Sequence, residues 1–341
     1  MSLLRLVLYP FSMLYGFVTA TRNHMFDRGI KTSFEFDANV IGVGNLTVGG
    51  TGKTPMVEYL IRLLNDRKIT TLSRGYGRKT RGFRIASEKD DALTIGDEPY
   101  QFYRKFPKVS VTVGEQRALA IPHILAELEP DVILMDDSYQ HRYVKPNCNI
   151  LLTDYHRLFY KDHILPAGRL RESREGASRA DIIVVTKCPW DLSKQQMGVI
   201  RKQIEKYSAA PVCFATIQYE KPVPVNEDSR WCDDVVLFSG LANNISFTQH
   251  VSQRYNLLND FYFPDHHDYS MQDLLAIESG WRQTGGESTC VVTTEKDYVK
   301  LLSEDLRSTI EHWPLYYIPI EMKFLDNQET FDQTIINSIK A

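Results

Sequence analysis

This chain of 341 residues lacks cysteine pairs, a strong net charge and a long uninterrupted apolar run. Its five cysteines are scattered without a Cys-x-x-Cys pair, which argues against both a disulfide framework and a zinc site. A net charge of −3 gives no global reason to expect a nucleic-acid partner. With 43% hydrophobic and 24% charged residues and no internal repeat, the chain is an ordinary folded protein that is long enough for two domains.

The most apolar segment, residues 3–18, is too short to span a bilayer, which takes roughly 20 apolar residues. Arg5 and Pro10 interrupt it, and it has no small-x-small cleavage site, so a secretory signal is not expected. Leucines and aromatic residues with basic flanks, here including Arg22, are typical of a helix that lies in a membrane surface. A helix packed on the protein's own core is the alternative.

A glycine-rich segment follows an apolar run at residues 40–43, and this order predicts a phosphate-binding loop before a helix. Residues 49–54 have the sequence Gly-Gly-Thr-Gly-Lys-Thr. Glycines allow backbone N–H groups to turn towards phosphate, and the helix adds its positive N-terminal end. Lys53 is then placed to reach the β- and γ-phosphates, and Thr54 to ligate Mg²⁺. Thr47 stands where the usual pattern has glycine, and a glycine-rich turn with a chance Lys-Thr pair is the alternative.

Apolar segments that fit strands alternate with segments that fit helices, which predicts an α/β fold with a mainly parallel sheet flanked by helices. Ligands are expected at the carboxyl ends of such strands. The expected strands are 37–44, 69–73, 109–113, 131–137, 149–154 and 181–186, and the expected helices are 55–66 and 117–128. Beyond residue 213 the alternation restarts, with strand candidates at 235–239, 255–262 and 290–293.

We therefore expect three parts: a membrane-associated helix at 1–30, a P-loop domain at 31–213 and a smaller α/β domain at 214–341. The boundary is expected within the proline-containing segment 209–225. The last segment, 326–340, fits a helix that could pack back on the first domain.

Two acidic pairs follow apolar or glycine-containing segments. Asp136 and Asp137 end an apolar strand, as in a Walker-B element that delivers a carboxylate to Mg²⁺, although strand-end aspartates are often turn residues. Asp97 and Glu98 follow Gly96, where a carboxylate could take a proton from a hydroxyl or hold a metal-bound water. A helix N-terminus that favours acidic residues is the alternative for this second pair.

Histidines and arginines form the remaining candidates. His266 and His267 are adjacent and cannot both point one way, so a single histidine hydrogen-bonded to a carboxylate is favoured over a two-histidine metal site or a surface loop. The segments 73–79 and 165–172 each combine glycine with arginines, which suits an anionic group, although a solvated charged turn is the default. Residues 186–189 approximate the Thr-Lys-x-Asp element that reads guanine, but Pro189 replaces its aspartate, so GTP specificity is not supported.

Seven segments in this order resemble the tetraacyldisaccharide 4′-kinases, the lipid A pathway kinases of Gram-negative envelopes. They are 42–45 with 49–55, then 73–77, 96–99, 136–142, 165–172, 263–267 and 294–297. The resemblance extends from the apolar N-terminus to about residue 300. The threonine at 47 is shared with that family, whereas Ser138-Tyr139 stand where many members have Gly-Phe.

The resemblance implies transfer of the ATP γ-phosphate, with Mg²⁺, to the 4′-hydroxyl of a tetraacylated glucosamine disaccharide 1-phosphate. It implies two α/β domains that close on ATP, and a monotopic protein on the cytoplasmic face of the Gram-negative inner membrane. The partners implied are the acylated lipid and the membrane surface. No nucleic acid and no obligate protein partner are expected.

The resemblance also implies roles for individual residues. Asp97 is expected to receive the hydroxyl proton, with His266 assisting by hydrogen bonding and by raising its basicity. Thr54 and one of Asp136 and Asp137 are expected to hold Mg²⁺, and Glu98 to orient a metal-bound water. The expected nucleotide loop is Thr47, Val48, Gly49, Gly50, Thr51, Gly52, Lys53 and Thr54. The expected substrate-binding residues are Arg74, Arg117, Gln140, His141, Arg171 and Glu172.

The second hypothesis is a membrane-associated P-loop ATPase or GTPase that uses hydrolysis as a switch. It accounts for Lys53, Thr54 and Asp136, but not for the apolar N-terminus, the arginine-containing segments or a second domain with Asp265 and His266. A nucleotide-binding scaffold without catalysis is the third hypothesis, and the full set of acid, base and metal candidates disfavours it.

Overall fold

The computed structural model describes residues 3–226 and 229–340 and divides the chain into two compact units. Unit 1 comprises Met1–Arg74, Lys108–Ile217 and Met322–Ala341, and unit 2 comprises Gly75–Pro107 and Gln218–Glu321. The chain therefore passes from one unit to the other at four places, one of which lies inside the expected boundary segment 209–225. The other passages arise because residues 75–107 pack with the second unit and the C-terminal segment with the first. The contiguous domain division expected from the sequence stays a prediction.

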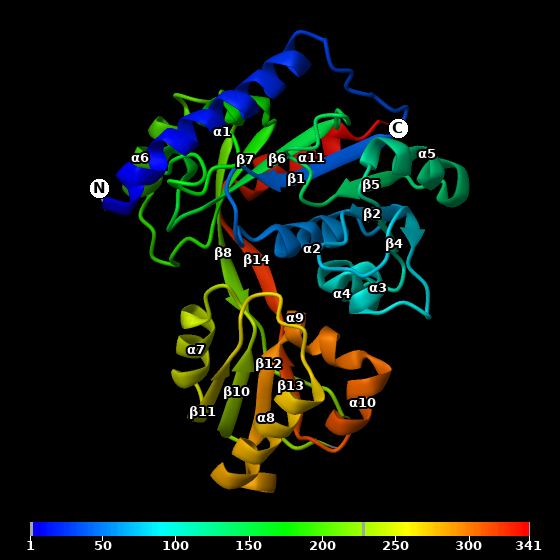
Figure 1. Cartoon of the computed structure of the whole chain (residues 1–341), viewed down its shortest axis with the longest axis vertical. Coiled ribbons are helices and arrows are strands. Elements are labelled where there is room, and N and C mark those ends of the chain that lie inside the picture. The colour runs from blue at the N-terminus through cyan, green and yellow to red at the C-terminus, as the bar shows by residue number, and fades with distance from the viewer. Residues whose placement is uncertain (1–2, 227–228, 341) are drawn as a thin grey trace. The chain divides into compact units, whose positions relative to one another are not determined.

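Unit 1 is built on a sheet whose strands run in the order β14-β8-β7-β6-β1-β5-β2-β4 (Figure 1). The strands are β1 (Asn39–Asn45), β2 (Ile69–Ser73), β4 (Ser110–Val113), β5 (Val132–Met135), β6 (Cys148–Asp154), β7 (Ile182–Thr186), β8 (Val212–Tyr219) and β14 (Ile320–Asp326). All strand pairs from β8 through β4 are parallel. Strands buried on both faces read as continuous apolar runs, which is why this sheet could be predicted from the sequence.

The helices of unit 1 follow its strands. They are α1 (Leu3–Asp27), α2 (Lys53–Leu63), α5 (Arg117–Leu128), α6 (Lys194–Ile204) and α11 (Gln328–Ser338), with the short 3₁₀ helices η1 (Phe159–Lys161) and η2 (Arg174–Arg179). Buried apolar side chains of α2, including Met56 and Leu60, contribute to the core. The Tyr59 hydroxyl donates to a carboxylate oxygen of Asp332 at 2.7 Å, so the last helix packs on this unit.

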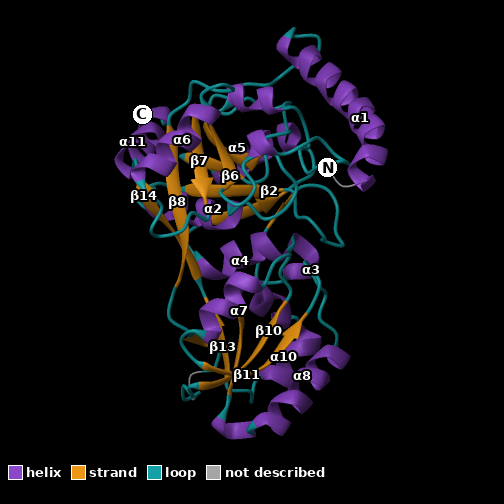
Figure 2. Cartoon of the chain, turned by 90° about the vertical axis from the view of Figure 1, so that its left-hand side faces the viewer, coloured by secondary structure: helices purple, strands orange, loops and turns teal. Residues whose placement is uncertain are grey.

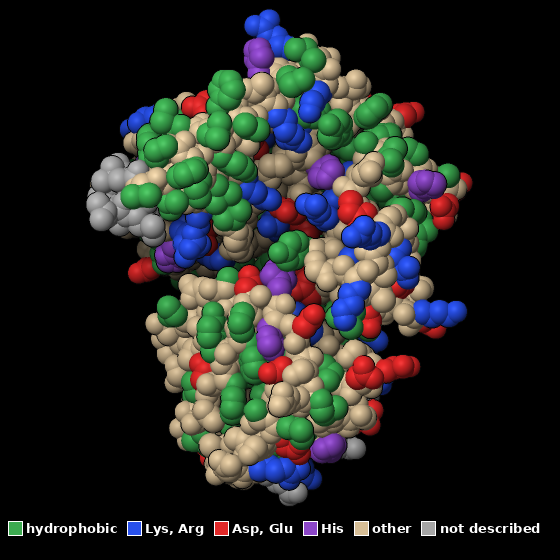
Figure 3. Space-filling view, viewed as in Figure 1, with side chains coloured by type: hydrophobic (Ala, Val, Ile, Leu, Met, Phe, Trp, Pro, Cys, Tyr) green, Lys and Arg blue, Asp and Glu red, His purple; other side chains and the backbone are tan. Residues whose placement is uncertain are grey.

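Helix α1 exposes its apolar side chains. Phe11, Leu14, Phe17 and Val18 are 58–70% exposed, and Figure 3 shows hydrophobic side chains gathered over this helix. These residues are not packed in the protein's own core, which was the alternative for the N-terminal segment. No helix in the described parts of the chain is long and apolar enough to cross a membrane.

Unit 2 has a sheet in the order β11-β10-β12-β13-β9, parallel except at the β13–β9 pair (Figure 2). Its strands are β9 (Val223–Pro224), β10 (Asp234–Ser239), β11 (Asn256–Tyr262), β12 (Cys290–Thr294) and β13 (Leu315–Ile318). The short β3 (Arg84–Ile85) falls within the residues of unit 2 but is not a strand of this sheet. Its helices are α3 (Ala92–Ile95), α4 (Asp97–Lys105), α7 (Ile245–Ser252), α8 (Met271–Thr284), α9 (Glu295–Tyr298) and α10 (Glu304–Ile310), with η3 (Gly286–Ser288) and η4 (Val299–Leu302). Phe238, Trp281 and Trp313 lie in its core.

Candidate active site

The loop between β1 and α2 has the backbone of a phosphate-binding loop. Gly49 and Gly52 have φ of 107° and 84°, a left-handed conformation that glycine adopts without a Cβ penalty. Gly52 is the N-cap of α2, and no side chain caps that helix. The N–H groups of Lys53 and Thr54 at the start of α2 therefore point where an anion can be bound. Pro55, which follows, has no N–H to satisfy.

Residues at the ends of β1 and β7 hold this loop by hydrogen bonds. Asn45 at the end of β1 donates from Nδ2 to the Thr51 hydroxyl at 2.7 Å, and the Thr186 hydroxyl at the end of β7 donates to the Thr51 carbonyl at 2.8 Å. Lys187 donates to the Gly50 carbonyl. Thr186 and Lys187, noted in the sequence as part of an incomplete guanine-reading element, thus brace the loop itself.

The carboxylates that follow β5 lie beside this loop. Asp137 forms ion pairs with Lys53 (Oδ1 to Nζ, 3.5 Å) and with Arg171 (Oδ1 to Nη2, 2.9 Å). Partial burial raises the pKa of Asp137, but the Lys53 ammonium and the Arg171 guanidinium outweigh it and hold that pKa well below its usual range. Asp136 is 2% exposed, and its Oδ1 accepts the Asp137 backbone N–H at 2.9 Å.

Magnesium usually keeps one or two protein carboxylates and takes further ligands from nucleotide phosphates and water. The described parts of the chain contain no group of three or more His, Cys, Asp or Glu residues that could hold a metal ion. Two adjacent carboxylates beside the loop, with the Thr54 hydroxyl in the first turn of α2, fit a metal held together with a nucleotide rather than by the protein alone.

Arg117 was expected in the substrate-binding set, and its side chain is completely buried. Its guanidinium donates to the backbone carbonyls of Gly114 (2.9 Å) and Asp136 (3.2 Å). Burial lowers the pKa of Arg117 to about 10, so it stays charged at neutral pH. In this structure Arg117 supports the turn that carries the two aspartates.

Gln140, Arg171 and Glu172 converge at the end of β1. Gln140 donates from Nε2 to the Asn45 carbonyl (2.9 Å) and to Glu172 Oε1 (2.9 Å), and Arg171 donates to both the carbonyl and the side-chain oxygen of Asn45. Glu172 is 2% exposed and also accepts from Arg179 at 2.9 Å.

His141 and Arg74 complete the expected substrate-binding set. Burial, followed by the positive charges of Arg117, Arg74 and Arg22, lowers the pKa of His141 to about 4. This imidazole is therefore neutral near pH 7, among three guanidinium groups. Arg74 is exposed just after β2.

A second group of predicted residues lies within unit 2. Asp97 is the first residue of α4 and is 8% exposed. Its Oδ2 lies 2.9 Å from His266 Nδ1, 3.7 Å from Lys296 Nζ and 4.0 Å from Lys300 Nζ. Glu98 is half-buried beside it, and its backbone N–H donates to Asp97 Oδ1 at 2.9 Å. The structure thus places His266 against Asp97, as the resemblance implied.

The electrostatics of this pair differ from the expectation that His266 raises the basicity of Asp97. Burial raises the pKa of Asp97, but the hydrogen bond from His266 and the ammonium groups of Lys296 and Lys300 outweigh it, so that pKa lies well below the ordinary value. A donor that bonds to a carboxylate stabilises its charged form, and this is the physical reason for the correction. His267 points elsewhere, with its Nε2 3.1 Å from Asp273 Oδ2.

The two lysines of this group were missed as functional candidates. Both follow β12, and the segment 294–297 that contains Lys296 was noted only for its resemblance to a family motif. Its place after an apolar strand was the available signal, because ligands gather at such strand ends.

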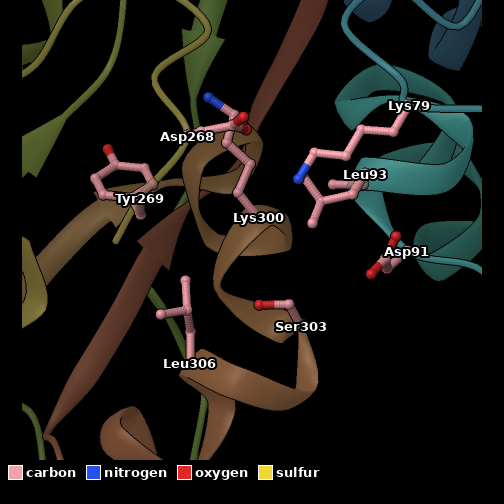
Figure 4. Close-up of a pocket in the computed structure, with 9 residues that line it drawn as sticks. Lys79, Asp91, Leu93, Asp268, Tyr269, Lys300, Ser303 and Leu306 are labelled. Atoms are coloured by element: carbon pink, nitrogen blue, oxygen red, sulfur yellow. The ribbon is translucent and has the colours of Figure 1, made fainter. Parts of the chain in front are cut away.

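Unit 2 also contains a pocket of about 120 Å³, which is lined by Lys79 of the candidate segment 73–79 but by none of the individually predicted site residues. In Figure 4 the Lys79 side chain extends towards Lys300, and Asp91 and Asp268 lie on opposite sides of the view. Two lysines and two aspartates balance one another, so the lining carries no excess charge. Lys300 is the residue that this pocket shares with the Asp97 group.

Comparison with known proteins assigns the family. The family model described as tetraacyldisaccharide-1-P 4′-kinase (LpxK) matches residues 4–340. The chain belongs to this family. A tetraacyldisaccharide 4′-kinase of Flavobacterium johnsoniae is 44% identical, with 100% of this chain and 98% of that protein covered. One of Bacteroides thetaiotaomicron is 42% identical, with 98% and 93% covered.

A solved structure supports the same family. LpxK from Aquifex aeolicus, in complex with ATP, has a TM-score of 0.77 and 30% identity, and 99% of this chain and 100% of that chain are covered. The predictions of family and α/β fold are therefore confirmed, and with them an ATP-dependent kinase of lipid A biosynthesis. The hydrolytic switch and the non-catalytic scaffold are not supported.

Proposed function

We propose that this LpxK family member transfers the γ-phosphate of ATP to the 4′-hydroxyl of a tetraacylated glucosamine disaccharide 1-phosphate, with the residues of the two groups in the roles given below. The observation that carries the proposal is the cluster of Lys53, Asp137 and Arg171 at the uncapped N-terminus of α2. A nucleoside triphosphate with its Mg²⁺ is bound by these features: a helix N-terminus that binds anions, a lysine near the phosphates and an adjacent carboxylate.

The loop 47–54 binds the phosphates through its backbone N–H groups, and Lys53 braces the β- and γ-phosphates. Thr54 and one of Asp136 and Asp137 are the proposed Mg²⁺ ligands, and Glu98 the proposed partner of a metal-bound water. Bound Mg²⁺ neutralises charge on the β- and γ-phosphates. Arg171 is ion-paired with Asp137 and hydrogen-bonded to Asn45, so it holds the carboxylate and the loop in one arrangement.

Asp97 is the proposed acceptor of the 4′-hydroxyl proton. The bond from the 4′-oxygen to the γ-phosphorus forms, the bond from that phosphorus to the leaving ADP oxygen breaks, and the proton passes to the Asp97 carboxylate. A low pKa keeps this carboxylate ionised at neutral pH, although it also makes a weak base. A weak base suffices where the transition state is loose, because positioning and charge neutralisation then dominate catalysis.

The proposed acceptor is the glucosamine disaccharide, with Arg74, Gln140, His141, Arg171 and Glu172 as candidates for binding its hydroxyl and phosphate groups. The acyl chains are proposed to remain in or near a bilayer that the exposed apolar side chains of α1 contact. The cytoplasmic face of the inner membrane is the proposed location, because ATP is available there. No nucleic acid and no obligate protein partner are proposed.

The test is transfer of radiolabel from γ-³²P-ATP in detergent micelles, with and without tetraacyldisaccharide 1-phosphate. Label that moves into the lipid with wild-type protein and fails to move with Lys53→Ala supports the proposal. Release of free phosphate that is indifferent to the lipid overturns it in favour of a membrane-associated nucleotide hydrolase.

A further inference from the structure

Helix α1 has an inner side as well as the exposed apolar one. Its buried or half-buried residues recur at positions 8, 12, 16, 19, 22, 23, 25 and 26, close to the spacing of one face of an α-helix. Several of these residues are polar and hydrogen-bond to loops of unit 1 that carry proposed acceptor-binding residues. A helix that served only as a surface anchor would need no such contacts.

The middle of α1 lies along the segment 163–172. The Ser12 hydroxyl accepts the Ala167 backbone N–H at 2.9 Å, and the Tyr15 hydroxyl donates to the Arg171 carbonyl at 3.1 Å. At Gly16 the helix and this segment approach so closely that a Cβ on Gly16 would lie 3.2 Å from Ile164 Cδ1. This part of the helix therefore packs directly on the segment that presents Arg171 and Glu172.

The last turns of α1 hold the segment 139–143. Arg22 donates to the Gln140 carbonyl at 3.1 Å, and Arg142 donates to the Asn23 carbonyl at 2.8 Å and to Asp27 at 2.6 Å. The Phe26 ring, 6% exposed, has the guanidinium groups of Arg22 and Arg142 5.2 Å and 5.1 Å from its centre. These contacts bind the helix end to the turn that carries Gln140.

Asn23 makes the most direct link to the proposed acceptor site. Its Nδ2 donates to Glu172 Oε2 at 2.7 Å. The other oxygen of that carboxylate, Oε1, accepts from Gln140 and Arg179. A carboxylate as buried as this one needs donors on both oxygens, and among the described residues of unit 1 Asn23 is the donor to Oε2.

We propose that α1 is a positioning element of the acceptor site, in which Asn23 fixes the Glu172 carboxylate and Arg22 fixes the backbone at Gln140. The same helix therefore meets a lipid surface on one side and orders the acceptor loops on the other. This inference rests on the proposed function for the identity of the acceptor, whereas the ordering of the two loops by α1 does not depend on it.

The first arm of the test compares Asn23→Ala and Asn23→Asp in the full-length protein with His24→Ala, an exposed neighbour on the same turn. A hydrogen bond to a charged group supports a loss of about 10- to 100-fold in kcat/KM for the lipid acceptor in Asn23→Ala. Asn23→Asp is expected to lose more, because two carboxylates then face each other. The KM for ATP and sedimentation with vesicles are expected to stay at wild-type values.

A double-mutant cycle tests whether Asn23 acts through Glu172. If it does, Asn23→Ala adds little to the loss already caused by Glu172→Gln. Fully additive losses, or an Asn23→Ala variant as active as His24→Ala, would overturn the proposal. The opposite face provides the matched control, since Phe17→Ser is expected to reduce vesicle binding.

Hydrogen exchange supplies a readout that does not need activity. Amides of the segments 137–144 and 163–172 are expected to exchange faster in Asn23→Ala and Asn23→Asp than in wild type, His24→Ala or Phe17→Ser. Unchanged exchange would overturn the positioning role. If the wild-type protein transfers no phosphate to the lipid, the proposed function fails, and the exchange data still decide whether α1 orders these loops.

Discussion

Replacement of Asp97 by asparagine is the sharpest perturbation of the proposed chemistry. The change conserves size and removes the charge that lies 2.9 Å from His266 Nδ1 and within 4.0 Å of two lysine ammonium groups. Asp97 is nearly buried in unit 2, whereas the phosphate-binding loop belongs to unit 1. We therefore expect Asp97→Asn to bind ATP almost normally while turnover falls.

The expected loss of turnover in Asp97→Asn follows from the proposed role of Asp97 as a general base. A positioned general base contributes about 10²- to 10⁴-fold to a rate. Because the surrounding positive charges make Asp97 a weak base, and because a loose phosphoryl-transfer transition state asks little of a base, we expect a value towards the lower part of that range. The measurement is kcat for transfer to the lipid under saturating ATP, with the dissociation constant for ATP determined separately.

The pH dependence gives a second, independent readout. The folded-state pKa of Asp97 is lowered, so the ionised form persists above that depressed pKa and is lost only as the pH falls through it. In a plot of kcat against pH, we therefore expect no fall in kcat from protonation of Asp97 between about pH 8 and 5, since even an ordinary aspartate has a pKa of about 3.9. The fall at lower pH is the acid limb of this plot. In Lys296→Met one ammonium is removed, the pKa of Asp97 rises, and the acid limb moves to higher pH.

Two results would refute this reasoning. An Asp97→Asn variant that turns over within about twofold of wild type would remove Asp97 from the proton transfer. An acid limb that stays in place or moves to lower pH in Lys296→Met would show that the lysine does not stabilise the Asp97 carboxylate.

Three further predictions concern the loop, the N-terminal helix and the core. Lys53→Ala is expected to lower transfer by at least about 100-fold, since the γ-phosphate charge loses its lysine, and near-normal transfer would contradict the P-loop assignment. Removal of residues 1–24 is expected to release the protein from vesicles in a sedimentation assay, and continued sedimentation would rule out α1 as the anchor. Leu60→Ala is expected to lower the free energy of unfolding in urea by about 2–5 kcal/mol because Leu60 is fully buried, whereas Leu119→Ala, at a side chain 63% exposed, should change it by less than about 0.5 kcal/mol.

Local sequence patterns were sufficient for the features that depend on neighbouring residues. The phosphate-binding loop could be predicted because glycine at 49 and 52 permits a left-handed backbone and the apolar run before it is a buried strand. The predicted helix at 117–128 matches α5, and the predicted strand at 69–73 matches β2. Their apolar spacing and flanking residues carry that information along the chain.

Features that depend on distant residues could not be predicted in this way. Asn23 and Glu172 are 149 positions apart in the sequence, and nothing local to either one indicates their hydrogen bond. The complete burial of Arg117 was also unexpected, because arginine is usually exposed and only the tertiary structure shows the backbone carbonyls that satisfy it. For the same reason, the sequence does not indicate that residues 75–107 pack with the second unit, whose other residues lie more than 100 positions later in the chain.

Backbone strain occurs in each of the two groups of proposed functional residues. Five described residues other than glycine have a positive φ, and Asp137 (45°) and His266 (56°) are two of them, in a left-handed conformation that is uncommon for such residues. Such strain costs on the order of 1–3 kcal/mol and persists where surrounding contacts enforce it. At Asp137 the ion pairs with Lys53 and Arg171 supply those contacts, and at His266 the bond to Asp97 does. Glycine at either position would relax the backbone but remove the side chain. If the side chain has a functional role, the glycine variant is expected to have a larger free energy of unfolding and a lower turnover than the wild-type protein.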